Sequence, residues 1–143
     1  MGGAAMAIHE SGENYLEQIL ILSRQKDRVR AVDICHSLGF SRPTVSVMLR
    51  ELRASGFVTD AESGGLALTP SGMEVAERVY ARHCLLAEAL MKLGVSHETA
   101  LEDACKVEHD LSDETIGCIK KWLNNQSFFL IINLSLSISI VIV

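Results

Sequence analysis

The stretch SRPTVSVMLRELRASG, residues 41–56, decides the fold. Ser41 can accept a hydrogen bond from the free amides of a first helical turn, and Pro43 sits where its missing N–H is harmless, so a helix is predicted to begin here. Gly56 suits the position just after the helix, because glycine adopts a positive φ without strain. Three apolar residues recur at the spacing of one buried helical face: Val45, Leu49 and Leu52.

The segments on either side of this helix complete a motif. Upstream, AVDICHSLGF (residues 31–40) predicts a short helix closed by Gly39, and two short helices joined through such a turn make a helix-turn-helix. Downstream, apolar residues in 57–59 and 66–68 flank DAESGG, whose glycines suit a hairpin turn. The sequence therefore predicts a winged helix-turn-helix.

The second helix of this motif has an exposed face of a kind that binds DNA. Its side chains offer guanidinium, hydroxyl and small apolar groups, which suit phosphates, base edges and thymine methyls. We therefore predict that residues 42–50 enter a major groove. The predicted DNA-binding residues are Ser41, Arg42, Pro43, Thr44, Ser46, Val47 and Arg50. The alternative is a purely structural helix pair whose arginines, Arg53 among them, are solvated surface charges.

Charge is distributed unevenly along the chain. The net charge is −5, which is unusual for a protein that binds DNA. Residues 24–58, however, carry seven Lys and Arg against three Asp and Glu, whereas residues 83–123 carry four against eight. The basic segment coincides with the predicted DNA-binding helix, so the acidic segment is expected to serve another purpose.

Length and composition limit the class of protein. A chain of 143 residues holds one domain or two small lobes. Its four cysteines form no CxxC pair, and the N-terminus has no basic region followed by an apolar one, so we expect a reduced, cytoplasmic protein without a signal peptide. The chain lacks HExxH, GxSxG and a phosphate-binding glycine loop, which argues against an enzyme and a small-molecule substrate.

The rest of the chain is predicted to be mainly helical. Ser11 can cap a first helix, Pro70 opens a long helix that ends near Gly94, and Ser96 and Ser112 open two more, over 97–111 and 113–123. We predict a winged helix-turn-helix DNA-binding domain in residues 1–70, followed by a linking helix and a helical metal-binding and dimerisation domain in residues 71–123. The second lobe is too small to bury much alone, so a homodimer is expected.

Residues 124–143 form an atypical apolar tail. The last 16 residues, FFLIINLSLSISIVIV, carry no charge. This run is shorter than the roughly 20 residues that a membrane-spanning helix needs. We interpret the tail as a non-native end and do not expect a membrane partner, although a membrane-anchored regulator is the alternative. If exposed, the tail would promote aggregation and weaken a dimer.

Several side chains carry metal-ligand chemistry. Cys105, Glu108 and His109 stand at i, i+3 and i+4, which predicts one helical face with the spacing of a metal half-site. His83 interrupts the apolar stripe of the long helix, and Asn14 and Glu17 share a face of the first helix. Sulfur, nitrogen and oxygen donors together suit a divalent transition ion. A metal-independent winged-helix regulator that responds to a small organic ligand is the alternative.

Four stretches resemble the DtxR/MntR family of metal-dependent transcriptional repressors: ENYLEQI (13–19), SRPTVSVMLREL (41–52), LTPSGMEVAERVYARHCLLAEAL (68–90) and EDACKVEHDLSDET (102–115). In that family, a divalent metal binds between the first helix, the linking helix and the dimerisation lobe. The metal-loaded dimer binds operator DNA and typically shuts off metal-uptake genes. The resemblance therefore implies a repressor dimer that requires Mn(II) or Fe(II).

The resemblance also implies roles for individual residues. His83 matches the family's histidine on the linking helix, and Glu108 and His109 match its Glu-His pair. Glu17 matches the first-helix glutamate of the manganese-sensing branch. Asn14 occupies the position of a first-helix ligand that is Asp in one branch and Met in the other.

The choice between manganese and iron stays open in the sequence. Cys105 stands where iron-sensing members have cysteine and manganese-sensing members have glutamate. Glu17 and the absence of an added C-terminal domain favour manganese. The iron branch's second site uses a histidine where this chain has Leu101, so a complete iron-type second site is not expected.

Overall fold

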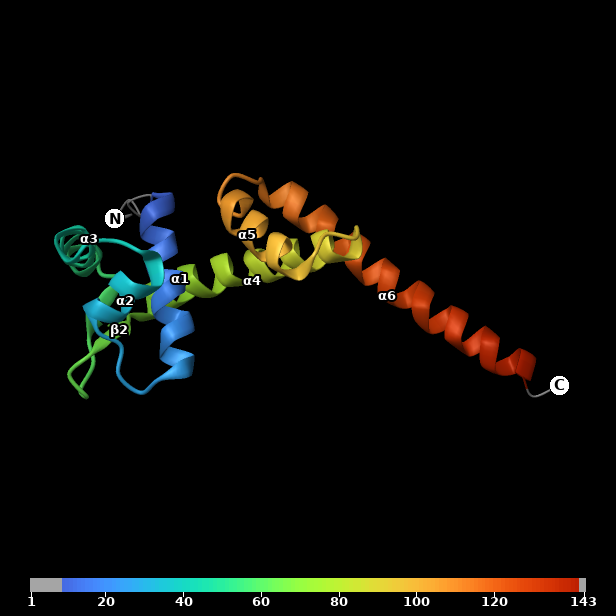
Figure 1. The fold of residues 1–143 in the computed structure, drawn as a ribbon, viewed down its shortest axis with the longest axis horizontal. Coiled ribbons are helices and arrows are strands. Elements are labelled where there is room, and N and C mark those ends of the chain that lie inside the picture. Colours follow the sequence, from blue (N-terminus) through green and yellow to red (C-terminus); the bar gives the residue numbers. More distant parts are fainter. Residues whose placement is uncertain (1–8, 142–143) are drawn as a thin grey trace, which may run out of the picture. The chain divides into compact units, whose positions relative to one another are not determined.

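The computed structural model describes the backbone of residues 9–141 and the side chains of residues 9–127. Over this range the chain is mainly helical, with one small hairpin (Figure 1). The elements are α1 (Glu10–Gln25), α2 (Ala31–Leu38), α3 (Arg42–Ala54), β1 (Val58–Asp60), β2 (Leu66–Leu68), α4 (Pro70–Lys92), α5 (His97–Val107) and α6 (Asp113–Val141). The chain divides into two compact units between Ala81 and Arg82, so α4 contributes to both. The predicted fold class is confirmed.

The helix-turn-helix is set by local backbone chemistry. Gly39 ends α2 with a φ of 71°, in the left-handed region that favours glycine. Ser41 then caps α3 and accepts a hydrogen bond from the Thr44 N–H at 3.4 Å. Gly56, with a φ of 79°, follows the end of α3. Gly39 confirms the end predicted for the first helix of the motif. Ser41 and Gly56 confirm the start and the end predicted for the second helix.

The wing is fastened to the loop that precedes α2. β1 and β2 pair antiparallel, with Val58 opposite Leu68. The Leu66 N–H donates to the Val29 carbonyl at 2.7 Å, and Arg28 Nε donates to the Gly64 carbonyl at 2.9 Å. Both bonds join the hairpin to the chain that enters α2, so the wing is fixed relative to the helix-turn-helix.

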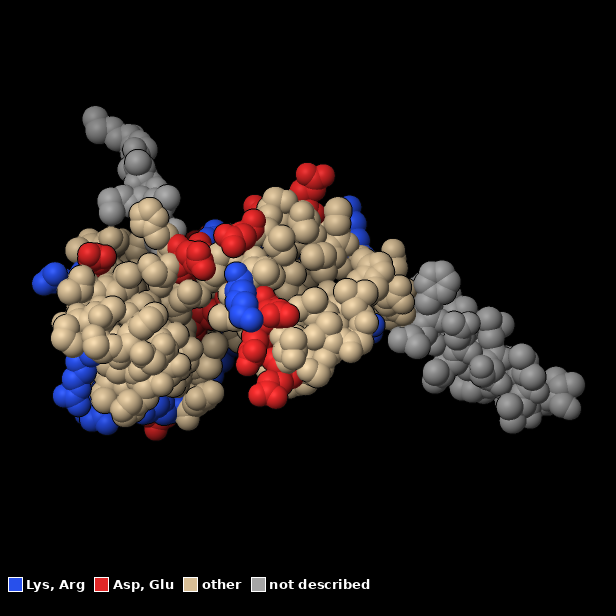
Figure 2. Space-filling view, turned by 45° about the horizontal axis from the view of Figure 1, so that its top comes forward, with Lys and Arg blue, Asp and Glu red and all other residues tan. Residues whose placement is uncertain are grey.

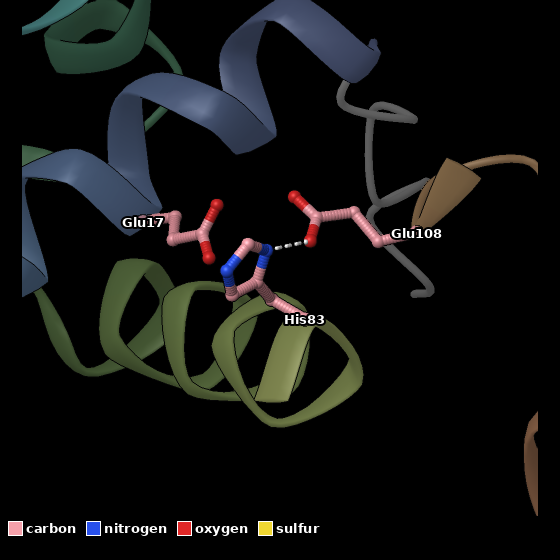
Figure 3. Close-up of side chains that lie close together, drawn as sticks. All are labelled: Glu17, His83 and Glu108. Carbon is pink, nitrogen blue, oxygen red and sulfur yellow. Dashed lines mark hydrogen bonds and ion pairs between the residues drawn. The ribbon is translucent and has the colours of Figure 1, made fainter. Parts of the chain in front are cut away.

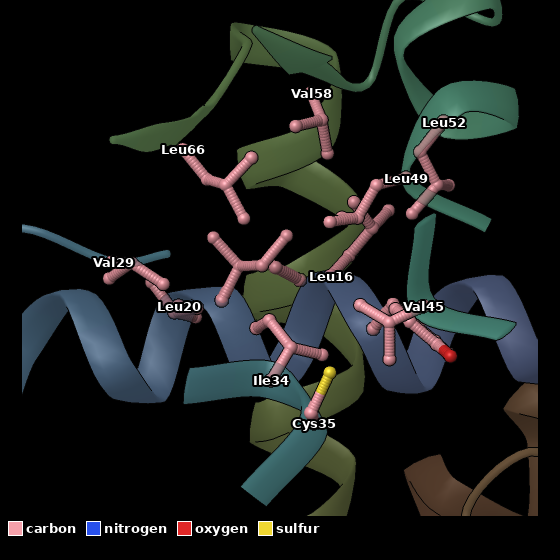
Figure 4. Close-up of a cluster of buried hydrophobic side chains, with 13 residues drawn as sticks. Leu16, Leu20, Val29, Ile34, Cys35, Val45, Leu49, Leu52, Val58 and Leu66 are labelled. Atoms are coloured by element: carbon pink, nitrogen blue, oxygen red, sulfur yellow. The ribbon is translucent and has the colours of Figure 1, made fainter. Parts of the chain in front are cut away.

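The core of the first unit joins α1, α2, α3 and the wing (Figure 4). Val45, Leu49 and Leu52 are all buried, as the spacing predicts. Tyr15 of α1 is also buried, and its ring stacks on that of Phe40 with centroids 6.0 Å apart. Burial raises the pKa of the Tyr15 hydroxyl, and the nearby Cys35 thiol adds to this effect. The buried face of α3 is therefore held by apolar contacts with the rest of this core, and the polar side chains of α3 are exposed.

Asp33 stabilises the start of α2. Its carboxylate accepts a hydrogen bond from the Arg30 N–H at 2.7 Å and pairs with Lys26 Nζ at 2.7 Å. The hydrogen bond from Lys26 is the main reason why the pKa of Asp33 lies below its ordinary value of 3.8, and the Arg30 backbone bond adds to it. The charged carboxylate therefore favours the folded state.

We expect Asp33→Asn to lower the free energy of unfolding by up to about 1 kcal/mol at neutral pH, because asparagine can still accept from the Arg30 N–H but loses the ion pair with Lys26. Because the folded pKa is the lower one, the contribution is present above the unfolded pKa and is lost as pH falls through the folded pKa. The difference in free energy of unfolding between wild type and Asp33→Asn should therefore become smaller at acid pH. Urea unfolding at several pH values measures it. Asp27→Asn, an exposed neighbour, is the control, and equal stability of Asp33→Asn and wild type at neutral pH would contradict the role.

The second unit holds a smaller core between α4, α5 and α6. Gly94 follows the end of α4 with a φ of 101°, and Ser112 caps α6 by accepting a hydrogen bond from the Thr115 N–H at 3.2 Å. The apolar side chains of the core come from all three helices and from the turn before α6: Leu86, Ala87, Ala104, Leu111, Ile116 and Ile119.

Three helix ends differ from the predicted ones. α1 begins at Glu10 with His9 as its N-cap, because acidic side chains in a first turn favour the helix and bring its start ahead of Ser11. α5 ends at Val107 rather than at 111, and the Asp110 N–H closes a turn onto the Val107 carbonyl at 3.1 Å. The acidic side chains there oppose a longer helix, because negative charge is unfavourable at a helix C-terminus.

The third difference is the length of α6, which continues to Val141 instead of ending at Leu123. No glycine or proline follows Leu123 to end the helix. No helix among the described residues is long and apolar enough to cross a membrane. The predicted exposure and aggregation of residues 128–143 concern side chains that lie outside the described ones.

Candidate metal centre

A buried carboxylate and an imidazole meet in the second unit. His83 lies on α4, and its Nδ1 is 2.8 Å from Glu108 Oε2 (Figure 3). The side chain of Glu108 is 0% exposed and that of His83 is 18% exposed. A carboxylate removed from water is costly unless hydrogen bonds or a positive charge compensate it. The buried carboxylate of Glu108 therefore needs compensating hydrogen bonds or a positive charge.

A second imidazole lies on the other side of the same carboxylate. His109 has a side chain that is 4% exposed, and its Nε2 is 3.3 Å from Glu108 Oε1. Among the described residues, no group makes a hydrogen bond of acceptable geometry with this buried oxygen. The second unit thus holds a fully buried carboxylate between two imidazoles, with one oxygen whose hydrogen bonding is incomplete.

This donor set fits a divalent metal ion. Carboxylate oxygen and neutral imidazole nitrogen are common ligands of Mn(II), Fe(II) and Zn(II). Buried polar atoms are nearly always hydrogen-bonded, so a buried oxygen that lacks a hydrogen bond of good geometry is expected to gain a further partner in the working protein. A cation bound by Glu108 would supply that partner.

The local fold positions Glu108 at the end of a helix. Glu108 is the C-cap of α5, and its N–H donates to the Ala104 carbonyl at 3.0 Å. Ala100 and Ala104 are fully buried, and such small side chains let α5 pack closely on its neighbours. The C-terminal end of a helix carries partial negative charge, which also favours a cation there.

The predicted face of Cys105, Glu108 and His109 forms only in part. Glu108 and His109 lie beyond the end of α5, where both side chains are buried. Cys105 lies within α5 and is exposed. All four cysteines fall in the described part of the chain, and none of them forms a disulfide there. The role of Cys105 as a ligand stays a prediction.

The two first-helix candidates belong to the other unit. Glu17 of α1 is 7% exposed, and Asn14 is half-buried. On the same helix, Glu13 pairs with Arg78 of α4 at 3.1 Å. Because the units are separate bodies, the participation of Glu17 and Asn14 in a metal site stays a prediction.

The predicted DNA-binding residues share one exposed surface of the first unit. Ser41 caps α3, the other six lie on it, and all seven side chains are exposed. Arg53, one turn further along, pairs with Asp60 of the wing at 2.8 Å. Lys and Arg side chains gather at the lower left of Figure 2, on this unit. The arrangement leaves α3 accessible along the face expected to contact DNA.

Two protein families match the chain. One, described as the iron dependent repressor N-terminal DNA binding domain, matches residues 7–66. The other, described as the iron dependent repressor metal binding and dimerisation domain, matches residues 69–128. The first match contains α3 and its exposed face, and the second contains His83, Glu108 and His109.

Individual proteins are similar over the same region. Transcriptional regulator MntR of Salmonella typhimurium is 38% identical over 104 residues, which are 73% of this chain and 66% of that protein. HTH-type transcriptional regulator MntR of Geobacillus kaustophilus is 36% identical over 109 residues, covering 76% and 77%.

Solved structures give the same result for the fold. The manganese regulator SloR is 30% identical, with a TM-score of 0.71 over 79% of this chain and 53% of that one. A manganese-dependent transcriptional repressor in complex with manganese is 28% identical, with a TM-score of 0.69 over 79% and 52%. The chain thus spans about half the length of these two structures.

Proposed function

The chain belongs to the iron-dependent repressor family of transcriptional regulators, which are not enzymes, and on that premise we propose that it is a metal-dependent repressor that binds operator DNA as a homodimer. The observation that carries the proposal is the His83–Glu108–His109 cluster: a buried, incompletely hydrogen-bonded carboxylate between two imidazoles. It lies in the segment matched by the metal-binding and dimerisation domain.

The proposed ligands are His83, Glu108 and His109 from the second unit and Glu17 from the first. A bound divalent ion would supply positive charge that compensates the carboxylates of these ligands. In support, Glu17 is a buried acid on the helix whose Glu13 pairs with Arg78 of α4. His83 lies five residues beyond Arg78 on that same helix. Asn14 and Cys105 are proposed as additional ligands.

This ligand set would couple the metal centre to DNA binding. Glu17 belongs to the unit that carries α3, whereas His83, Glu108 and His109 belong to the other unit. Ligands from both units would restrict the motion of one unit relative to the other. In a homodimer, the restriction would hold two α3 helices about one DNA turn apart, roughly 34 Å. Such coupling is reciprocal, so DNA should tighten metal binding by the same factor.

We propose Mn(II) as the physiological ion and Fe(II) as the alternative. Two similar solved structures are those of a manganese regulator and of a manganese-dependent repressor, and Glu17 would add an oxygen ligand, which suits Mn(II). Cys105, a softer donor, would favour Fe(II), but it is exposed, unlike the buried Glu108. Genes for metal uptake are the expected targets.

The proposal is tested by retention of genomic DNA fragments on the protein in anaerobic buffer. Retention is expected with Mn(II), and it should be lost when a chelator replaces the metal. The more effective of Mn(II) and Fe(II) shows which ion the ligand set prefers. Equal retention in chelator would leave a winged-helix regulator without a metal switch.

A further inference from the structure

Arg82 ties α4 to the segment between α5 and α6. One guanidinium nitrogen, Nη2, donates to the Leu111 carbonyl, and Nη1 is 3.2 Å from Asp113 Oδ1. The side chain is only 15% exposed. Its Nε is buried, with no hydrogen-bond partner among the described residues. An arginine held in this way loses hydration that is not fully replaced, so its placement has a cost.

The segment that Arg82 holds is the one that carries the buried donors. Glu108 and His109 follow α5, and Leu111 comes two residues after His109. The first part of this turn is closed by backbone bonds onto the end of α5, from the Glu108 N–H and the Asp110 N–H. Arg82 fixes its far end. Arg82 also immediately precedes His83, so one short piece of α4 carries both the imidazole and the side chain that holds the opposite donors.

The two contacts of Arg82 are unequal. Asp113 has a side chain that is 97% exposed, and exposed ion pairs contribute little because water screens them. Leu111 packs against the core of the second unit, and the bond to its carbonyl is partly buried. The contact with the Leu111 carbonyl is therefore the one expected to position the turn.

We infer that Arg82 is a positioning residue of the metal centre, which holds Glu108 and His109 opposite His83 before the ion binds. The inference rests on the proposed function where it concerns the metal. Metal affinity depends on donors that are already in place, and partners that orient ligands typically change it by about 10–100-fold. The sequence gives little sign of this role, because arginines are common on exposed helix faces.

The test measures Mn(II) affinity by equilibrium titration of the full chain, together with hydrogen exchange of residues 108–112 in the metal-free protein. Arg82→Gln is expected to weaken Mn(II) binding about tenfold or more and to speed exchange in the turn. Arg82→Lys should lie between it and wild type, because an ammonium group can still donate to the carbonyl. Lys120→Gln, which removes the same charge from an exposed site on α6, and Asp113→Asn should stay close to wild type.

The possible outcomes separate this inference from the proposed function. Wild-type Mn(II) affinity and wild-type exchange in Arg82→Gln would overturn the positioning role. If Arg82→Gln fails to fold, Arg82→Lys and Asp113→Asn are compared by Mn(II) affinity and by hydrogen exchange. Weaker Mn(II) binding and faster exchange in Arg82→Lys alone would support the positioning role, and equal values in the two variants would overturn it. If the wild-type chain binds no Mn(II), the proposed function fails, whereas faster exchange in the metal-free variant would still support Arg82 as the residue that holds the turn.

Discussion

Glu108→Gln is expected to abolish metal-dependent DNA binding while leaving the protein folded. Glutamine has nearly the shape of glutamate but lacks the negative charge, and its amide nitrogen cannot ligate a cation. We expect Mn(II) affinity to fall by about a hundredfold or more, beyond the usual effect of a residue that only orients a ligand. Equilibrium titration with Mn(II) and operator retention with and without Mn(II) measure the two consequences separately.

The matched control for this substitution is Glu102→Gln, which makes the same chemical change at an exposed site on α5. Its Mn(II) affinity and DNA retention should equal those of wild type. The loss of the buried charge can even stabilise the metal-free Glu108→Gln protein, because a carboxylate without full compensation is costly to bury. Unchanged Mn(II) affinity in Glu108→Gln would mean that the His83–Glu108–His109 cluster is only structural.

Arg50→Ala is expected to weaken operator binding by about 1–3 kcal/mol without changing Mn(II) affinity in the absence of DNA. Arg50 is exposed on α3, and it lies outside the buried face formed by Val45, Leu49 and Leu52. If Arg50 contacts a base edge, the loss should be greatest for the preferred operator. If it contacts a phosphate, binding should weaken equally for all DNA sequences. The slope of the logarithm of affinity against the logarithm of salt concentration should then become smaller by about one.

Lys92→Ala is the control for Arg50→Ala, because it removes one exposed positive charge at the end of α4, far along the chain from α3. Quantitative operator binding at several salt concentrations distinguishes the two variants. Equal losses in both would indicate a general charge effect. Wild-type affinity in Arg50→Ala would show that α3 does not contact DNA through this side chain.

The helix-turn-helix could be predicted because its signals are local. Gly39, Ser41 and Gly56 each determine a helix end within a few residues of themselves, and the buried positions of α3 follow directly from its period. The exposure of the predicted DNA-binding residues follows as well, since it is the other side of the same helix.

The candidate metal ligands could be predicted only as a set of residue types. The spacing of Cys105, Glu108 and His109 predicts one helical face, but α5 ends at Val107, and that end depends on opposing charges and a turn that periodicity does not reveal. The bond between His83 and Glu108 joins residues 25 positions apart, and it depends on the packing of α4 against α5. The contact of Arg82 with the Leu111 carbonyl could not be predicted either, because it also joins residues that are far apart in the sequence.

The prediction that α6 ends at Leu123 is wrong, because it rests on the composition of the apolar tail alone. Alternating serine and β-branched residues are unfavourable for a helix but do not end one, whereas glycine and proline do. The helix therefore continues from Asp113 to Val141.

Metal binding and DNA binding are expected to be coupled, so each affinity should be measured in the presence and absence of the other ligand. Operator affinity is measured with saturating Mn(II) and with chelator, and Mn(II) affinity is measured with and without operator DNA. We predict that Mn(II) raises operator affinity at least tenfold and that DNA raises Mn(II) affinity by the same factor, as linkage requires. Equal operator affinity in Mn(II) and in chelator would show that metal binding does not control DNA binding.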